Sequence, residues 1–168
     1  NLLLTSITAA NINVYDYAEA HPQCSGMGTT VVACIARADR CVIAHAGDSR
    51  AYLSDDSLRR ITTDHSYVQT LVDRGLITEE EAESHPNKNL ITRALGVNEE
   101  IEIDFDSVPL PENAKLLLCS DGLTNYVPEE EISGILRTES DDAAKRLIAL
   151  ANENGGGDNI TAVIISQN

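Results

Sequence analysis

The stretch LLLCSDG at residues 116–122 limits what this chain can fold into more than any other part of its sequence. Three leucines and a cysteine predict a fully buried strand. The strand runs into Asp121, so a carboxylate lies at the end of an apolar element, and Gly122 behind it permits a tight turn. A buried charge costs free energy unless it is paired. The two obvious partners are a basic side chain and a metal ion.

Apolar spacing along the rest of the 168 residues predicts both strands and helices. Strands are expected at residues 29–36, 41–47, 50–54, 58–62, 100–108, 115–120 and 159–166. Helices are expected at residues 1–20, 67–76, 78–85, 128–137 and 141–154. Thr78 followed by Glu81 has the spacing of a capping box at the start of the third of these. The first four strands should form an antiparallel meander, and the fifth should carry Ile101, Ile103 and Phe105 on its buried side. We therefore expect one α+β domain over residues 1–168, with sheet and helices in separate layers.

Composition narrows the choice of partners. The formal net charge of −15 argues against nucleic acid and anionic membranes, because both attract clustered Lys and Arg. No apolar run approaches the length that crosses a bilayer, and the first residues lack the features of a secretory signal. The four cysteines fit no zinc pattern. We expect Cys34, Cys41 and Cys119 to be small buried side chains in a reduced, cytoplasmic chain.

Three segments each place an aspartate beside a glycine at the rim of an apolar strand. These aspartates are Asp48, Asp121 and Asp158. Gathered at one rim, their oxygens would suit a hard cation such as Mg²⁺ or Mn²⁺. Without a cation, mutual repulsion would oppose full ionisation of all three. Taken singly, each aspartate is also ordinary turn chemistry, and Arg50 could be a plain salt-bridge partner of Asp48.

The histidines and the missing motifs point away from other chemistries. His45 alternates with apolar residues and is expected in the core, and His65 is expected to hydrogen-bond locally in a turn. His85 precedes a proline at a helix end, where the helix dipole favours it. The chain has no GxSxG elbow. Its glycine-rich segment at residues 26–30 lacks the lysine of a phosphate-binding loop.

Together these segments resemble the metal-dependent PP2C-type serine/threonine protein phosphatases, in particular the bacterial ones. The resemblance is carried by GMGTT, GDSRAYL, TTDHSYVQTLVDRGLITEEEAESHPNKNLITRALG, LLLCSDGLTNYV and GGGDNIT, in the family's order from about Gly26 to Ile165. It implies a β-sandwich flanked by helices in α-β-β-α layers. It also implies hydrolysis of phosphoserine and phosphothreonine by water that two Mg²⁺ or Mn²⁺ ions activate, without a covalent phosphoenzyme.

The resemblance assigns roles to metal-site residues. By it, Asp121 and Asp158 are ligands of the two-metal centre, with Gly122 beside Asp121 in the same site. Asp48 matches the ligand of a third, weaker ion that Asp121 would share. No catalytic side chain is assigned on this chain.

The resemblance also assigns a role to residues 64–97, which are mostly polar and read as a surface excursion from the sheet. They match the flap beside the active site, which is associated with substrate choice. Its candidate substrate residues are His65, Ser66 and Arg93. The implied partners are phosphorylated proteins and a cognate serine/threonine kinase.

The chain departs from the family at its beginning. Family members first carry an Arg-x-x-Asn-Glu-Asp-type segment and an Asp-Gly-x-Gly-Gly-His segment, and nothing in residues 1–25 resembles either. By the resemblance, these supply a phosphate-binding Arg, a metal-bridging Asp and a candidate general acid. We therefore expect the C-terminal part of a catalytic domain, lacking the N-terminal strands and first helix. It should bind fewer ions, have little or no activity alone, and self-associate through exposed sheet edges.

Two alternatives stay open at this point. The chain could be a catalytically dead phosphatase-like module that binds phosphoproteins or other partners without turnover. It could also belong to a metal-dependent phosphohydrolase that acts on small phosphorylated molecules. The complete flap favours the protein phosphatase, by resemblance alone.

Overall fold

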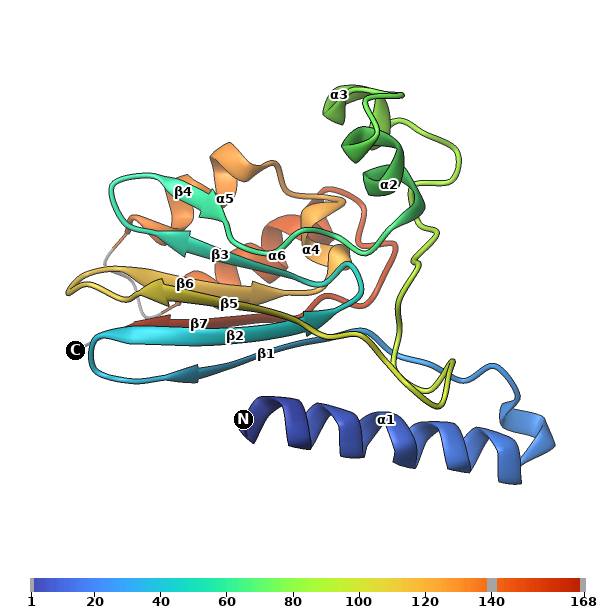
Figure 1. Ribbon diagram of the computed structural model, residues 1–168. Coiled ribbons are helices and arrows are strands. Elements are labelled where there is room, and N and C mark those ends of the chain that lie inside the picture. The colour runs from blue at the N-terminus through green and yellow to red at the C-terminus, as the bar shows by residue number, and fades with distance from the viewer. Residues whose placement is uncertain (1, 139–141, 167–168) are drawn as a thin grey trace. The chain divides into compact units, whose positions relative to one another are not determined.

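Two β-sheets form the framework of the computed structural model, which describes residues 2–138 and 142–166 (Figure 1). One sheet has the strand order β1-β2-β5 and the other the order β4-β3-β6-β7. The strands are β1 (Val31–Ala36), β2 (Arg40–Ala46), β3 (Arg50–Ser54), β4 (Leu58–Arg60), β5 (Asp104–Pro109), β6 (Lys115–Cys119) and β7 (Ala162–Ser166). The helices are α1 (Leu2–Ala20), the 3₁₀ turn η1 (Pro22–Cys24), α2 (Tyr67–Asp73), α3 (Glu79–Glu83), α4 (Asp121–Thr124), α5 (Glu129–Leu136) and α6 (Ala143–Glu153).

The predicted meander of the first four strands is wrong. The chain forms the β1–β2 hairpin and then moves to the other sheet, where β3 pairs with β4 and β6. The break falls at Gly47, whose φ of +113° suits only glycine. A Cβ at this position would lie 2.4 Å from the Cγ2 atom of Thr30, so the close approach also requires glycine. The sequence signals two hairpins correctly, but not the step between them.

Contacts between Cα atoms divide the chain into two compact units, which are described separately. The first unit contains the described residues up to Ala33, together with Ala44–Asp48 and Thr63–Phe105. The second contains Cys34–Ile43, Ser49–Thr62 and the described residues from Asp106 onward. The predicted flap at residues 64–97 belongs to the first unit. The assignment of residues 1–168 to a single domain stays a prediction.

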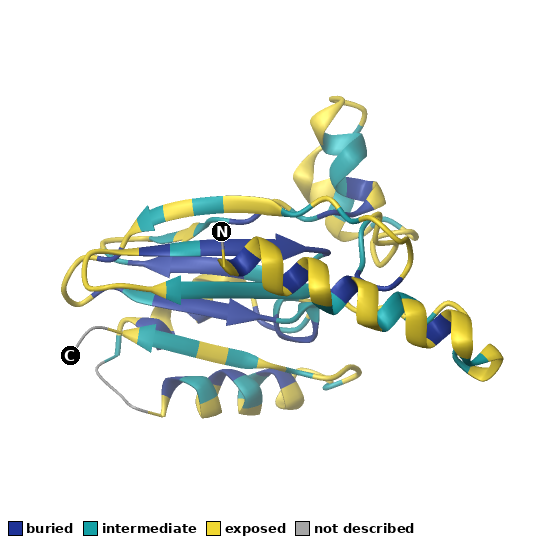
Figure 2. Cartoon of the chain, turned by 60° about the horizontal axis from the view of Figure 1, so that its bottom comes forward, coloured by how far each residue is buried: buried dark blue, intermediate teal, exposed yellow. Residues whose placement is uncertain are grey.

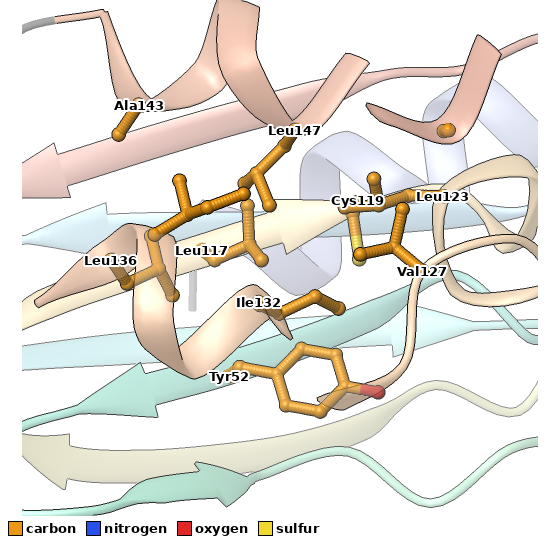
Figure 3. Packing of buried hydrophobic residues seen from close by; sticks show 11 residues of the cluster. Tyr52, Leu117, Cys119, Leu123, Val127, Ile132, Leu136, Ala143 and Leu147 are labelled. Atoms are coloured by element: carbon orange, nitrogen blue, oxygen red, sulfur yellow. The ribbon is translucent and has the colours of Figure 1, made fainter. Parts of the chain in front are cut away.

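An aliphatic core lies in the second unit, between strands β3 and β6 and helices α4, α5 and α6 (Figure 3). Leu117 on the predicted buried strand and Leu147 on α6 are both 0% exposed. Tyr52 is the one aromatic residue among the fully buried members of this cluster. The antiparallel register pairs Tyr52 with Leu117, and Leu117 with Ile164 of β7. Truncating a buried leucine of this kind to alanine would cost about 2–5 kcal/mol.

In the first unit, helix α1 presents one buried stripe and otherwise faces solvent (Figure 2). Leu3, Ile7 and Asn11 recur at every fourth residue in that stripe. Asn11 is fully buried, yet its side chain is satisfied. Its Nδ2 donates to the carbonyls of Asn98 and Glu99 at 3.0 and 2.9 Å, and its Oδ1 accepts from the Gly96 amide at 2.8 Å. A polar residue therefore anchors the helix at a position where apolar spacing alone predicts a hydrophobe.

Both helices of the excursion begin with a side-chain cap, of which the one at α3 was predicted. The Thr78 side chain accepts from the Glu81 amide at 3.2 Å, and the Glu81 carboxylate accepts from the Thr78 amide at 2.8 Å. This confirms the capping box at α3. Helix α2 begins with a serine cap, because the Ser66 hydroxyl accepts from the Gln69 amide at 3.2 Å.

The fifth strand is shorter than predicted. It begins at Asp104, and Phe105 is 38% exposed rather than on the buried side. Two carboxylates at the start of the strand explain the difference, because Glu102 before it and Asp104, its first residue, both pair with Arg93. These ion pairs hold the segment before the strand against the arginine. Of the helix predicted at residues 141–154, Asp141 lies outside the described residues.

The cysteine predictions are mostly confirmed. All four thiols are free, and Cys41 and Cys119 are buried in strands. Cys34 is only half-buried, so its expected burial is partly wrong. Within residues 2–138 and 142–166, none of the helices is both long and apolar enough to cross a membrane.

Candidate metal centre

Two of the predicted metal ligands meet in the second unit, at neighbouring ends of β6 and β7. These strands pair antiparallel, with Cys119 opposite Ala162. Asp121 follows the end of β6 and begins α4, while Asp158 lies in the loop that enters β7. Because the end of one antiparallel strand lies beside the start of its neighbour, the two carboxylates come together.

The charge of Asp158 acts on the Asp121 carboxylate. Burial raises the pKa of Asp121 above its usual value, and the negative charge of Asp158 raises this pKa further. The Gly122 amide and the positive charge of Arg50 oppose the shift without cancelling it. The Asn125 side chain donates to the Asp121 carboxylate at 3.3 Å. The hydrogen-bond donors and the positive charge around Asp121 therefore do not fully offset the cost of its ionised form.

This balance answers the question that the sequence raises about a carboxylate at the end of a buried strand. A basic side chain, Arg50, is near enough to act on Asp121, but its guanidinium also donates to the Tyr52 hydroxyl at 3.1 Å. The pKa of Asp121 stays raised in spite of it. Two adjacent carboxylates with a net deficit of positive charge are the donor set that fits a hard divalent cation.

Gly122 serves a purpose other than the predicted turn. Its φ is not positive, and Asp121 opens a single helical turn rather than a sharp bend. A Cβ at Gly122 would lie only 2.3 Å from the carbonyl oxygen of Asn159. Glycine is needed here because the Asp158–Asn159 segment approaches the backbone, not because of the backbone conformation.

Asp48 lies in the first unit, directly after Gly47. The turn that carries it is tied to His65 by two hydrogen bonds. The Gly47 amide donates to Nδ1 of His65 at 3.1 Å, and the His65 amide donates to the Gly47 carbonyl at 2.9 Å. The assignment of Asp48 to an ion shared with Asp121 stays a prediction.

A second cluster of metal-ligand types lies wholly in the first unit. His45, His65 and Asp104 each offer a ligand atom within 4.8 Å of the others. The two rings are stacked, with centroids 4.6 Å apart. Both histidines are buried, as predicted for His45. The Nε2 of His45 donates to the Thr63 carbonyl at 2.9 Å, and its Nδ1 is the one buried side-chain nitrogen or oxygen in the described residues without a hydrogen-bond partner.

Hydrogen bonds around His65 favour an ion-pair network over a metal site. Since Nδ1 of His65 accepts from Gly47, its proton lies on Nε2, 3.2 Å from the Asp104 carboxylate. Arg93 has one guanidinium nitrogen 3.1 Å from that Nε2 and 2.7 Å from Asp104. A cation bound here would have to displace the proton and lie against the guanidinium. Burial lowers the pKa of His65, with Arg93 and His45 adding to that effect and Asp104 opposing it.

The structure gives the three predicted substrate residues clear partners. The local hydrogen bond predicted for the His65 side chain is wrong, because its partners Gly47, Arg93 and Asp104 are distant in sequence. Ser66 is 3% exposed and caps α2, and Arg93 pairs with Glu102 and Asp104. Their contact with substrate stays a prediction. Sequence reasoning missed Asp104 as the partner of His65, because no local pattern links residues that are 39 positions apart.

Comparison with known proteins shows which family the chain is similar to. The model of the family described as protein phosphatase 2C matches residues 3–159. The serine/threonine phosphatase stp of Listeria innocua is 44% identical over 169 residues, covering 99% of this chain and 67% of the relative. The serine/threonine phosphatase Stp1 of Staphylococcus aureus has a similar structure, with a TM-score of 0.94 and 38% identity, covering 100% of this chain and 67% of that one.

A further solved structure bears on the metal. The catalytic domain of the serine/threonine protein phosphatase PstP, in complex with two manganese ions, matches with a TM-score of 0.84 and 42% identity. The match covers 94% of this chain and 66% of that one. The chain described here belongs to the protein phosphatase 2C family and spans about two thirds of the length of these relatives. The predicted family, α+β fold class and class of enzyme are thereby confirmed.

Proposed function

We propose that this chain supplies metal ligands to the active site of an enzyme that hydrolyses phosphoserine and phosphothreonine in proteins. The observation that carries the proposal is the pair of adjacent carboxylates at the ends of β6 and β7, whose charge Arg50 does not balance. Membership of the phosphatase family supports the reaction type. The manganese complex of PstP supports the kind of ion.

Asp121 and Asp158 would hold Mg²⁺ or Mn²⁺. When bound, such ions supply an activated water and neutralise charge on the phosphoryl oxygens. Asn125 orients the Asp121 carboxylate by donating to it at 3.3 Å. The close backbone contact at Gly122 keeps the segment that follows Asp158 against the start of α4. These residues hold the ligands before any ion arrives, which lowers the ordering needed on binding.

The finer parts of the proposal concern weaker ions, substrate and association. Asp48 is proposed to hold a third ion together with Asp121, and residues 64–97 to choose among phosphorylated protein substrates that a cognate kinase supplies. The 168-residue chain by itself is expected to turn over slowly or not at all. Self-association through strand edges is also proposed. Sedimentation velocity on the same preparations would detect it.

Metal binding is the test that does not depend on turnover. Mn²⁺ titration by calorimetry is expected to show a saturable site, and Asp121→Asn and Asp158→Asn should each weaken it by more than about 100-fold, beyond the range for residues outside the coordination sphere. The matched control is Asp142→Asn, an exposed carboxylate that pairs with Lys145 at 2.7 Å. Equal Mn²⁺ affinity in all four proteins would overturn the proposal.

Turnover is measured next, with a phosphothreonine peptide, Mn²⁺ and the same variants. Release of phosphate that depends on Mn²⁺ and disappears in Asp121→Asn supports hydrolysis by this site. Mn²⁺ binding and peptide binding without any release fit both the slow turnover expected of this chain and a binding module. Repeating the assay after adding the upstream segments that family members carry decides between the two, because a phosphatase regains turnover and a binding module does not. A chelator should abolish any phosphate release, and added Mn²⁺ should restore it.

A further inference from the structure

The second proposed metal ligand, Asp158, lies in a loop whose preceding glycines make the backbone flexible. Gly155, Gly156 and Gly157 lead from α6 into Asp158. The first two have φ values of +136° and +54°, and Asp158 itself is exposed. Glycine has more accessible backbone conformations than any other residue. The position of the Asp158 carboxylate therefore depends on what holds the loop from outside.

The Tyr126 side chain holds the loop on its leading side. A Cβ at Gly157 would lie 2.3 Å from the Tyr126 hydroxyl oxygen, and one at Gly155 would lie 3.1 Å from the ring atom Cε1. The ring thus lies directly against the glycine backbone, and a Cβ at Gly157 would have to displace the Tyr126 side chain. The Asn154 side chain donates to the Tyr126 carbonyl at 2.8 Å, which adds a second tie.

Tyr126 is itself firmly connected to Asp121. Backbone hydrogen bonds of 2.8 Å from the Asn125 amide to Asp121 and 3.1 Å from the Tyr126 amide to Leu123 continue the turn that α4 begins. The Tyr126 ring also packs on the hydrophobic core of the second unit. A shift of Asp121 and a shift of the glycine loop are therefore coupled through one side chain.

The Ser120 side chain holds the loop on its trailing side. Its hydroxyl donates to the Asn159 carbonyl at 3.1 Å and accepts from the Thr161 amide at 3.0 Å. Its backbone amide donates to the Thr161 carbonyl at 3.2 Å. Ser120 immediately precedes Asp121. Its hydrogen bonds therefore connect the backbone beside Asp121 to the segment that follows Asp158.

We infer that Tyr126 and Ser120 are positioning residues that fix the spacing between the Asp121 and Asp158 carboxylates and thereby set the affinity for a divalent cation. This inference rests on the proposed function, because it assigns these residues to the same metal centre. Asp158 is bracketed, with Tyr126 against Gly157 before it and Ser120 bonded to Asn159 and Thr161 after it. Both brackets start from the segment that carries Asp121.

A bracket is needed because the two carboxylates repel each other. Two ionised carboxylates held side by side are electrostatically unfavourable in the metal-free protein. A loop of three glycines would relieve this repulsion by moving Asp158 away, at little cost in backbone strain. Side chains that prevent that movement keep the site ready for a cation. Residues outside the coordination sphere typically change metal affinity by about 10–100-fold.

The two contacts of Tyr126 can be separated by substitution. The ring supplies the surface that the glycines pack on, whereas the hydroxyl adds contact only over Gly157. Tyr126→Phe keeps the ring and should bind Mn²⁺ within about 3-fold of the wild type, whereas Tyr126→Ala should bind at least about 10-fold more weakly. Ser120→Ala removes both hydroxyl hydrogen bonds and should fall in the same range as Tyr126→Ala.

The experiment is a Mn²⁺ titration followed by electron paramagnetic resonance on the wild type, Tyr126→Phe, Tyr126→Ala and Ser120→Ala. The control is Tyr17→Ala, an exposed tyrosine on α1 of the other unit. Amide hydrogen exchange of the metal-free proteins gives a second readout. Exchange at Asn159 and Thr161 should accelerate in the two alanine variants, while exchange in β3 stays unchanged. If Tyr126→Ala does not fold, Tyr126→Leu replaces it, with the same expected loss.

The outcomes separate this inference from the proposal on which it rests. Mn²⁺ binding by the wild type with equal affinity in Tyr126→Ala and Ser120→Ala overturns the inference alone. No Mn²⁺ binding by the wild type overturns the proposed function and this inference with it. Weakened binding with faster loop exchange in both alanine variants, and near-normal behaviour of Tyr126→Phe, supports it.

Discussion

The His65–Asp104 cluster of the first unit and the Asp121–Asp158 pair of the second both contain carboxylates, but the pKa of Asp104 and that of Asp121 are shifted in opposite directions. Asp104 has a guanidinium nitrogen at 2.7 Å and a ring nitrogen at 3.2 Å. Burial alone would raise the pKa of Asp104, but the hydrogen bonds from His65 and Arg93 hold it below its usual value. The pKa of Asp121 is raised instead, first by burial and then by the negative charge of Asp158.

The direction of the pKa shift distinguishes a carboxylate that stabilises the fold from one that is suited to bind a metal ion. A carboxylate whose charge is compensated by hydrogen-bond donors and a cation of the protein gains stability from them, and it has no need of a metal ion. A pair whose charges add is less stable in the metal-free chain, and it gains when a cation binds. Residue type does not distinguish the two regions, since both contain acids near strand ends. The charges that surround each acid do distinguish them.

The largest expected effect on the free energy of unfolding comes from replacing Asp104 in the first cluster. In Asp104→Asn, the side-chain oxygen can still accept from one donor, but the new amide would face the other donor, so either His65 or Arg93 loses its partner. We expect a loss of about 1–2 kcal/mol in the free energy of unfolding, reduced by the partial exposure of the pair. Urea denaturation of the metal-free protein measures it.

Glu102→Gln is the matched control for that prediction. Glu102 also pairs with Arg93, at 3.0 Å, but its side chain is 82% exposed. Its replacement should change stability by less than about 0.5 kcal/mol, since solvent screens exposed ion pairs. Equal losses in Asp104→Asn and Glu102→Gln would mean that the balance of charge around His65 does not stabilise the first region.

The second effect is a pH dependence that belongs to the first region. The pKa of His65 is lowered in the folded protein, mainly by burial, so the neutral ring is favoured there. The resulting stability is fully present above the unfolded-state pKa of about 6.5 and is lost as the pH falls from there through the folded value. Protonation would also place a hydrogen on Nδ1, which accepts from the Gly47 amide.

The comparison of His65→Gln with the wild type measures this dependence. Urea midpoints at about pH 7.5 and 5.5 should fall for the wild type more than for the variant, because glutamine does not titrate in this range. Asp104, Arg93 and His45 are the charged or titratable neighbours that set the shift, and all remain in the variant. Identical pH profiles for the two proteins would show that His65 does not contribute to acid sensitivity.

Much of the fold could be predicted from sequence because its signals are local. Apolar spacing located all seven strands and the longer helices of the described residues, and the Thr78 capping box marked a helix start. The step from one sheet to the other at Gly47 could not be predicted. It depends on a close approach to Thr30, 17 positions away, which leaves no mark in the local pattern.

The candidate site divides in the same way. Asp121 and Asp158 stood out because each lies beside glycine at a strand end, and the pairing of β6 with β7 brings them together. The one-turn helix at Asp121 was missed, and so was the true reason for Gly122, which depends on the Asn159 carbonyl. The positioning contacts of Tyr126 were missed for the same reason: they join segments that only the folded chain brings together.

The smallest effect is the sharpest test of the comparison, because it has the opposite sign to that of Asp104→Asn. Asp121→Asn removes one of two repelling charges, so the metal-free protein should become more stable at neutral pH. The gain should be below about 1 kcal/mol, because Asp121 is half-buried and solvent screens part of the repulsion. It should appear only as the pH rises above the unfolded value of about 3.9 and through the raised folded value.

Thermal unfolding with and without Mn²⁺ then separates charge from ligation. Mn²⁺ should raise the unfolding temperature of the wild type, because it binds only the folded state, and should leave that of Asp121→Asn unchanged. A variant that is less stable than the wild type without metal would place Asp121 with Asp104, as a carboxylate whose charge the fold already uses. A variant that is more stable without metal, yet unresponsive to it, would identify a ligand kept at the expense of stability.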